Sequence, residues 1–157
     1  MKKILALIIF VLLFNGSIFA ENQNEFILKK SKEEKRAKFV LLNIQQDYIT
    51  CYSFYKIGAE YVRKSNGDTT VINGIEKSSD ISLKFAHETG EIMNMTTEEM
   101  SSKVKTEMKN QLDIINNNFK NAAILLEKYA QKCKNLIEDK KQRISFWEEQ
   151  AKKKFNE

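Results

Sequence analysis

The sequence predicts an all-α protein, an antiparallel bundle of about four helices, with or without a separate short C-terminal helix, tied by one disulfide. The 157 residues contain no proline and only five glycines, so the residues that most often interrupt helices are scarce. Apolar residues recur at alternating spacings of three and four, as on one face of a helix. The only two cysteines, Cys51 and Cys133, lie in different parts of this pattern.

Residues 1–20 have the organisation of a secretory signal peptide. Lys2 and Lys3 precede an apolar run, residues 15–17 (Asn-Gly-Ser) interrupt it, and the small residue Ala20 follows, after which we expect cleavage. The alternative is an uncleaved membrane anchor, but the apolar run from Ile4 to Phe14 is shorter than the roughly 20 residues that span a bilayer. We therefore expect no stable membrane span after cleavage. Removal of the two lysines lowers 26 cationic residues to 24, against 21 acidic ones, a net charge of +3.

Residues 21–30 show no apolar periodicity and are expected to form a flexible tether. Residues 31–157 would then form a single helical-bundle domain. Ser31 and Glu34 match a capping box, in which each side chain satisfies a backbone amide of the first turn. A helix is therefore expected to begin at Ser31.

The first helix is predicted over roughly 32–65 from its apolar spacing. Between Leu41 and Val62, apolar residues follow one another at three and four positions. Asn66 and Gly67 then supply a left-handed stop.

Residues 66–79 are expected to form a loop with one helical turn, because glycine, asparagine and paired serines punctuate them. A second helix is predicted over 81–94. Phe85, Ala86, Ile92 and Met93 should face inward, and His87, Glu88 and Glu91 outward. Gly90 costs this helix up to about 1 kcal/mol relative to alanine, which suggests a close helix crossing there.

A strong start signal for the next helix lies at Thr96. Thr96 and Glu99 match a capping box, and Met95 and Met100 occupy the positions of a hydrophobic staple. Beyond them, neither glycine nor proline occurs, and apolar residues keep a heptad from Met108 to Leu136. Taken alone, this pattern predicts one long helix.

A disulfide between Cys51 and Cys133 is incompatible with that single helix. An unbroken helix would place Cys133 about 54 Å from Cys51, whereas bridged Cα atoms lie within about 7 Å. A reversal at residues 116–118, three consecutive asparagines, brings the cysteines to one level, and Asn121 can cap the returning helix. We therefore predict two helices and a disulfide, with one long helix and two buried free thiols as the alternatives.

The last segment carries its own start signal. Asp139 and Gln142 resemble a capping pair, so residues 140–154 are the candidate short C-terminal helix. Its apolar edge would run from Ile144 to Phe155.

Candidate binding residues cluster in the first helix, where four tyrosines and a phenylalanine surround Cys51. Aromatic side chains can line a pocket for an apolar ligand or a peptide, although they can also simply belong to the bundle core. Near the C-terminus, a tryptophan could anchor a protein partner or dock onto the bundle. The candidate contacts are Tyr48, Tyr52, Phe54, Tyr55 and Trp147.

Residues that carry chemistry are scarce. His87 with several methionines could ligate haem, but it is the single histidine, which favours an ordinary surface position. No phosphate loop, nucleophile elbow or H-E-x-x-H motif occurs, and clustered zinc ligands are lacking. We therefore predict no catalytic residue, no metal and no cofactor, although paired carboxylates such as Glu98 and Glu99 leave a carboxylate-only hydrolase open. Mixed charges in the lysine-rich segments indicate solvated helix faces, and no nucleic-acid partner.

These features predict a non-enzymatic helical protein, periplasmic or secreted, that acts by binding. The first interpretation is an accessory, chaperone-like or inhibitor protein with a protein partner in the cell envelope. The second is a carrier of a small apolar ligand or haem within the bundle. The sequence leaves the oligomeric state open.

Overall fold

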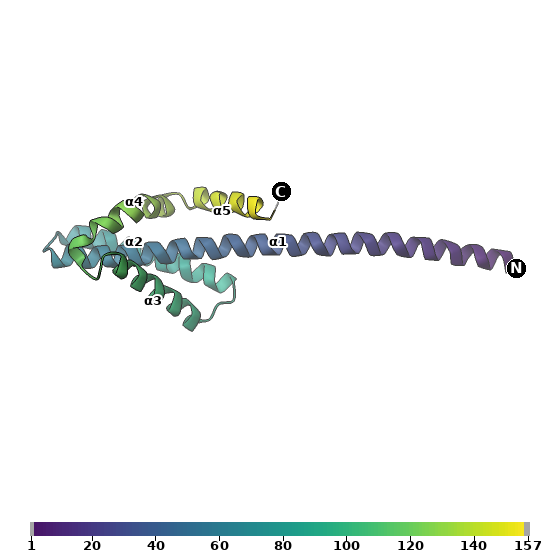
Figure 1. Cartoon of the computed structure of the whole chain (residues 1–157), viewed down its shortest axis with the longest axis horizontal. Coiled ribbons are helices and arrows are strands. Elements are labelled where there is room, and N and C mark those ends of the chain that lie inside the picture. The colour runs from purple at the N-terminus through teal and green to yellow at the C-terminus, as the bar shows by residue number, and fades with distance from the viewer. Residues whose placement is uncertain (1, 156–157) are drawn as a thin grey trace. The chain divides into compact units, whose positions relative to one another are not determined.

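The structure is a computed structural model that describes residues 28–155 in full and residues 2–27 only as part of the first helix. The described residues are all-α (Figure 1). Their helices are α1 (Lys2–Lys64), α2 (Thr69–Ile92), α3 (Thr97–Ile114), the 3-10 helix η1 (Phe119–Asn121), α4 (Ala123–Glu138) and α5 (Lys140–Lys154). The chain divides into two units, residues 1–37 and 38–157, and the bundle described below is the second. The predicted helical bundle tied by one disulfide is confirmed.

The helix start expected at Ser31 is wrong, because α1 is continuous through this residue. None of residues 17–57 is glycine or proline, so nothing in the sequence interrupts the backbone hydrogen bonding. Residues 28–30, expected in the tether, are exposed parts of the same helix. The expected signal peptide at 1–20 and the rest of the tether lie outside the fully described residues, and the domain division proposed there stays a prediction.

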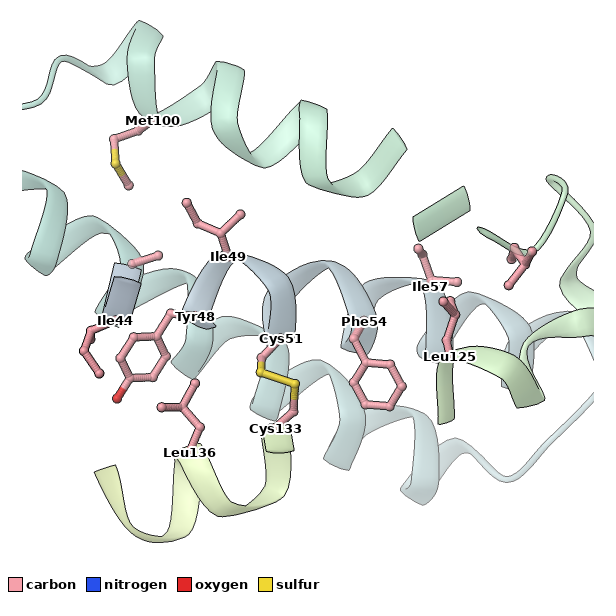
Figure 2. Close-up of a cluster of buried hydrophobic side chains, with 12 residues drawn as sticks. Ile44, Tyr48, Ile49, Cys51, Phe54, Ile57, Met100, Leu125, Cys133 and Leu136 are labelled. Carbon is pink, nitrogen blue, oxygen red and sulfur yellow. A yellow bond between two sulfur atoms is a disulfide. The ribbon is translucent and has the colours of Figure 1, made fainter. Parts of the chain in front are cut away.

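Within the unit 38–157, α1 is the central helix. In Figure 1, α3 lies on one side of it and α4 and α5 on another. The sequence pattern predicted one buried face around Cys51, but Ile49 and Ile57 are also buried, on other sides of the helix. Figure 2 shows the result, a core in which α1 supplies Ile44, Tyr48, Ile49, Cys51, Phe54 and Ile57, and the later helices supply Met100, Leu125, Cys133 and Leu136.

The chain reverses after α3, as the disulfide argument required. Asn116 and Asn117 both have φ of 53°, a left-handed conformation that asparagine tolerates. The reversal brings Cys51 and Cys133 into a disulfide with a Cα–Cα distance of 5.3 Å. The alternatives, one long helix and two free thiols, are therefore excluded.

The predicted role of Asn121 as the cap of the returning helix is wrong. Its side-chain amide donates to the carbonyl of Ile115 at 3.2 Å, and so closes the end of α3. The chain first forms η1, capped by the side chain of Asn118, and α4 then begins without a side-chain cap. Because η1 precedes α4, Asn121 is the last residue of η1 and does not occupy the N-cap position of α4.

The loop expected over 66–79 is also wrong, since α2 begins at Thr69. The side chain of Asp68 accepts a hydrogen bond from the Thr70 amide and caps this helix. Gly74 lies inside α2 in open space, where a glycine costs at most about 1 kcal/mol, too little to break a helix that packs on α1. The prediction that Ile92 faces inward is also wrong. Ile92 is the last residue of α2, and its side chain is 66% exposed.

The turn from α2 to α3 matches the sequence prediction. Thr96 accepts a hydrogen bond from the Glu99 amide at 3.2 Å, and Glu99 accepts one from the Thr96 amide at 2.8 Å. Gly90 marks a close crossing, because a Cβ atom there would lie 2.8 Å from the side-chain nitrogen of Gln45 and would also collide with Met100.

Candidate functional site

The five candidate contact residues do not form one site. Tyr48 is buried and stacks on Phe85, with ring centroids 5.2 Å apart. Burial raises the pKa of Tyr48, and the negative charges of Glu88 and Asp47 raise it further. Its hydroxyl is therefore neutral near pH 7, and the ring serves the core.

Tyr52 and Trp147 make other contacts. Tyr52 is half-buried beside α2, where its carbonyl accepts a hydrogen bond from Ser79 at 3.4 Å. Trp147 is docked onto the bundle, since its ring nitrogen donates to Asp47 at 2.6 Å and its ring meets Phe39 edge-on. Of the two sequence interpretations of Trp147, a partner anchor and docking onto the bundle, these contacts agree with docking.

Phe54 and Tyr55 do share a pocket, which lies between α1, α2 and α4 and has a volume of about 350 Å³. From α1 it is lined by Phe54, Tyr55, Ile57, Gly58, Tyr61 and Val62. From α2 comes Ile75, and from η1 and α4 come Ala122, Leu125, Leu126, Ala130 and Lys134. Apart from two tyrosine hydroxyls and the ammonium of Lys134, the lining side chains are entirely apolar.

Helical spacing explains why these residues meet. On α1 the lining positions follow one another at intervals of one to three residues, and from Ala122 to Lys134 at intervals of one to four. The Cys51–Cys133 disulfide joins the two helices about one turn before Phe54 and directly before Lys134. The covalent bond therefore fixes the separation of the pocket's two main walls at one end.

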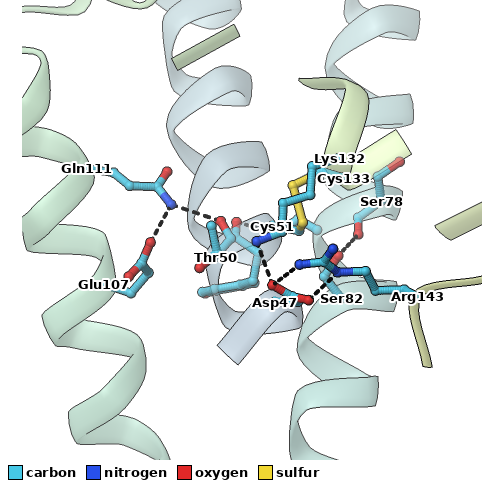
Figure 3. The surroundings of a disulfide bond; sticks show 12 residues. Asp47, Thr50, Cys51, Ser78, Ser82, Glu107, Gln111, Lys132, Cys133 and Arg143 are labelled. Atoms are coloured by element: carbon cyan, nitrogen blue, oxygen red, sulfur yellow. Dashed lines mark hydrogen bonds and ion pairs between the residues drawn. A yellow bond between two sulfur atoms is a disulfide. The ribbon is translucent and has the colours of Figure 1, made fainter. Parts of the chain in front are cut away.

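A second group of interacting side chains surrounds Asp47, a residue that the sequence analysis missed (Figure 3). The Asp47 carboxylate is only 4% exposed. Lys132 on α4 lies 2.5 Å from it, and the Nε and Nη2 atoms of Arg143 on α5 donate to its two oxygens at 2.6 and 3.3 Å. Together with the Trp147 indole, three side chains from two helices meet on one acid of α1.

The electrostatics of this group point to a structural role. Burial alone would raise the pKa of Asp47, but the hydrogen bonds from Arg143, Lys132 and Trp147 outweigh it and hold the pKa below its ordinary value. A carboxylate engaged by that many donors has little capacity left to accept a proton from a substrate. The group connects α4 and α5 to α1, and we call it the Asp47 latch.

One signal in the sequence could have revealed the Asp47 latch. Asp47 falls between apolar positions of α1, and Arg143 and Trp147 are four residues apart, on one face of a helix. A charged residue within an apolar stripe requires a partner, because an unpaired buried charge is costly. The sequence does not say which of many cations supplies it.

The methionines near the α2–α3 turn contact an amide. The side-chain nitrogen of Gln45, which is fully buried, lies 3.2 Å from the sulfur of Met95 and 2.8 Å from that of Met100. His87 is exposed on α2. Among residues 28–155, no group of three or more His, Cys, Asp or Glu side chains is arranged to hold a metal ion.

The paired carboxylates Glu98 and Glu99 are exposed at the start of α3, and Glu99 is engaged in the capping box.

In the part of the chain that the structure describes, no helix has both the length and the apolar character needed to cross a membrane. No protein-family model matches the chain, and comparison with curated proteins and with solved structures gives no significant match. Function must therefore be argued from the geometry above.

Proposed function

We propose that this chain is an exported, non-enzymatic protein that binds a small apolar ligand in the pocket between α1, α2 and α4. The observation that carries the proposal is the pocket itself, about 350 Å³ in volume, with a single charged residue in its lining. This volume lies within the range of small-molecule sites, about 300–1,000 Å³, and such sites are mostly apolar with few polar groups.

Two further features support the proposal. The core disulfide is compatible with a protein outside the cytoplasm, where such bonds persist. The rim residue Leu126 is 51% exposed, and a large apolar side chain at an entrance suits the capture of an apolar molecule.

Gly58 offers a direct test of the pocket. A Cβ atom at Gly58 would meet only Ile75, at an ordinary contact distance of 3.9 Å, so a larger side chain there would extend into the pocket. We expect Gly58→Leu to abolish binding of Nile red, a neutral apolar dye whose fluorescence rises on binding, and Gly58→Ala to retain it. Thermal unfolding would verify that both variants fold.

The proposal fails if the dye shows no saturable binding to the folded wild-type protein, or if Gly58→Leu binds it as well as Gly58→Ala does.

Export is tested separately by N-terminal sequencing, since protein recovered from outside the cytoplasm should have Glu21 as its first residue. Recovery only from the cytoplasm, with an intact N-terminus, would contradict export.

A protein partner is the second candidate function, favoured by the outer surface of α5. Phe146 is 41% exposed, although the next residue, Trp147, is docked inward. Exposed aromatic residues are enriched at the centres of protein interfaces. A partner that co-purifies with the wild-type protein and is lost specifically in Phe146→Ser would support an accessory role, whereas one retained by that variant would not.

A further inference from the structure

The pocket is elongated, with its cation at one end. Its lining on η1 and α4 runs from Ala122 to Lys134, twelve residues or about 18 Å of helix at 1.5 Å per residue. Every lining position on this side before Lys134 is alanine or leucine. The wall opposite runs antiparallel, because the disulfide places Phe54 and Tyr55 at the Lys134 end and Tyr61 and Val62 at the other.

The cation at that end is available to a ligand. Lys134 is exposed, and it takes part in none of the ion pairs or cation–π contacts among residues 28–155. Glu138, one turn further along α4, is the acidic group of this end, and its charge adds to burial in raising the pKa of Tyr55. Tyr55 therefore stays neutral and keeps a hydroxyl that can donate a hydrogen bond.

The lining also limits the chemistry of the occupant. A peptide would bring backbone N–H and C=O groups into a space whose walls offer them few partners, and each unpaired group is costly. An alkyl chain has no such groups. A single alkyl chain can lie along the roughly 18 Å of the wall that runs from Ala122 to Lys134.

We propose that the occupant is a single-chain fatty acid of about a dozen carbons, whose alkyl chain fills the pocket and whose carboxylate pairs with Lys134. This inference rests on the proposed function, because it names the class of ligand for the same pocket. The carboxylate lies at the end next to the disulfide, and the chain points along α4 toward Ala122.

Three amphiphiles of equal chain length test the inference by displacement of Nile red at concentrations below micelle formation. Laurate, dodecanol and dodecylammonium each have twelve carbons and a small polar head group, which is negative, neutral and positive respectively. An ion pair at an exposed site contributes up to about 1 kcal/mol, so we expect laurate to bind roughly three- to fivefold more tightly than dodecanol. The dodecyl cation should bind more weakly than laurate, because Lys134 repels it.

Matched variants identify the cation responsible. Lys134→Gln should remove the preference for laurate over dodecanol without weakening dodecanol. Lys141→Gln, which changes the charge of an exposed lysine on α5 outside the pocket, should leave the preference intact. Both variants should unfold at the wild-type temperature.

The outcomes separate the inference from the proposed function. Equal affinities for laurate and dodecanol, or a preference unchanged in Lys134→Gln, would overturn the carboxylate assignment and leave an apolar-ligand pocket. Failure of every amphiphile and of the dye to bind would overturn both. Tighter binding of lauroyl lysophosphatidylglycerol than of laurate would replace the free acid with a lysolipid as the ligand.

Discussion

Asp47 illustrates, at the scale of one residue, how a buried charge specifies an arrangement of helices. Its carboxylate accepts hydrogen bonds or ion pairs from Lys132, Arg143 and Trp147, which belong to two other helices. Apolar contacts tolerate a slide of one helix along another, but these donors meet the carboxylate only in one register. Removing the charge of Asp47 should therefore reduce the free energy of unfolding by more than the loss of one small buried side chain would.

We expect Asp47→Asn to lower the free energy of unfolding by about 3 kcal/mol, because breaking a buried ion pair leaves its partners uncompensated. Urea unfolding at pH 7 measures the change. Asp80→Asn, at an exposed position of α2, is the matched control and should change stability by less than about 0.5 kcal/mol. Similar small losses in both variants would contradict the role of the Asp47 latch.

The lowered pKa of Asp47 also predicts a pH dependence. A carboxyl whose pKa is lower in the folded than in the unfolded chain stabilises the fold fully above its unfolded pKa of about 4, and this contribution is lost as the pH falls through the folded pKa. Unfolding curves between pH 7 and pH 2 should show a steeper loss of stability for the wild type below pH 4 than for Asp47→Asn. Parallel curves for the two proteins would exclude this contribution.

At the scale of the elements, asparagine ends three successive helices. Asn66, Asn94 and the pair Asn116 and Asn117 all have φ between 53° and 56°, and they follow α1, α2 and α3. Each allows the last turn to close and the chain to leave in a new direction. In this sequence of few glycines, asparagine takes the left-handed positions that glycine usually occupies.

Those signals explain which elements could be predicted from the sequence. The ends at Asn66 and Asn116 and the start at Thr96 depend on local chemistry, and the structure has them where the residues indicate. The start of α2 also has a local cap, Asp68, which the sequence analysis missed because Gly74 and the neighbouring polar residues suggested a loop. The pocket needs residues from three helices, so the aromatic pattern of one helix located only Phe54 and Tyr55.

The two interior glycines of α2 should respond oppositely to the same substitution. Gly74→Ala should raise the free energy of unfolding by about 0.5–1 kcal/mol, because alanine favours the helix and a Cβ atom there meets nothing within 4 Å. Gly90→Ala should lower it by about 1–3 kcal/mol, because the new atom collides with the buried side chains of Gln45 and Met100. Chemical denaturation of both variants measures the contrast, and stabilisation by Gly90→Ala would show that the crossing is looser than described.

At the scale of the whole molecule, the disulfide closes a loop of 82 residues that contains α2 and α3. It joins the central helix to α4 where both are fully buried. A bond of this kind limits the freedom of the unfolded chain, and the effect increases with loop length.

Replacing both cysteines, as Cys51→Ala with Cys133→Ala, should lower stability by about 4.5 kcal/mol, the value expected for a loop of this length. Thermal or urea unfolding measures the loss. A reducing agent should destabilise the wild type by a comparable amount and leave the double variant unchanged. Insensitivity of the wild type to reduction would contradict a stabilising disulfide.

The central position of α1 also determines when the bundle can be completed during synthesis. During synthesis the central helix α1 is made first, and Arg143, a partner of Asp47, follows 96 residues later. Until α5 has been synthesised, Asp47 lacks the hydrogen bonds from Arg143 and Trp147, and Lys132 is its one partner within the Asp47 latch. Completion is then a late and cooperative event. A premature stop codon before residue 143 would yield a chain without most of α5, and we expect this chain to aggregate and to be degraded by proteases.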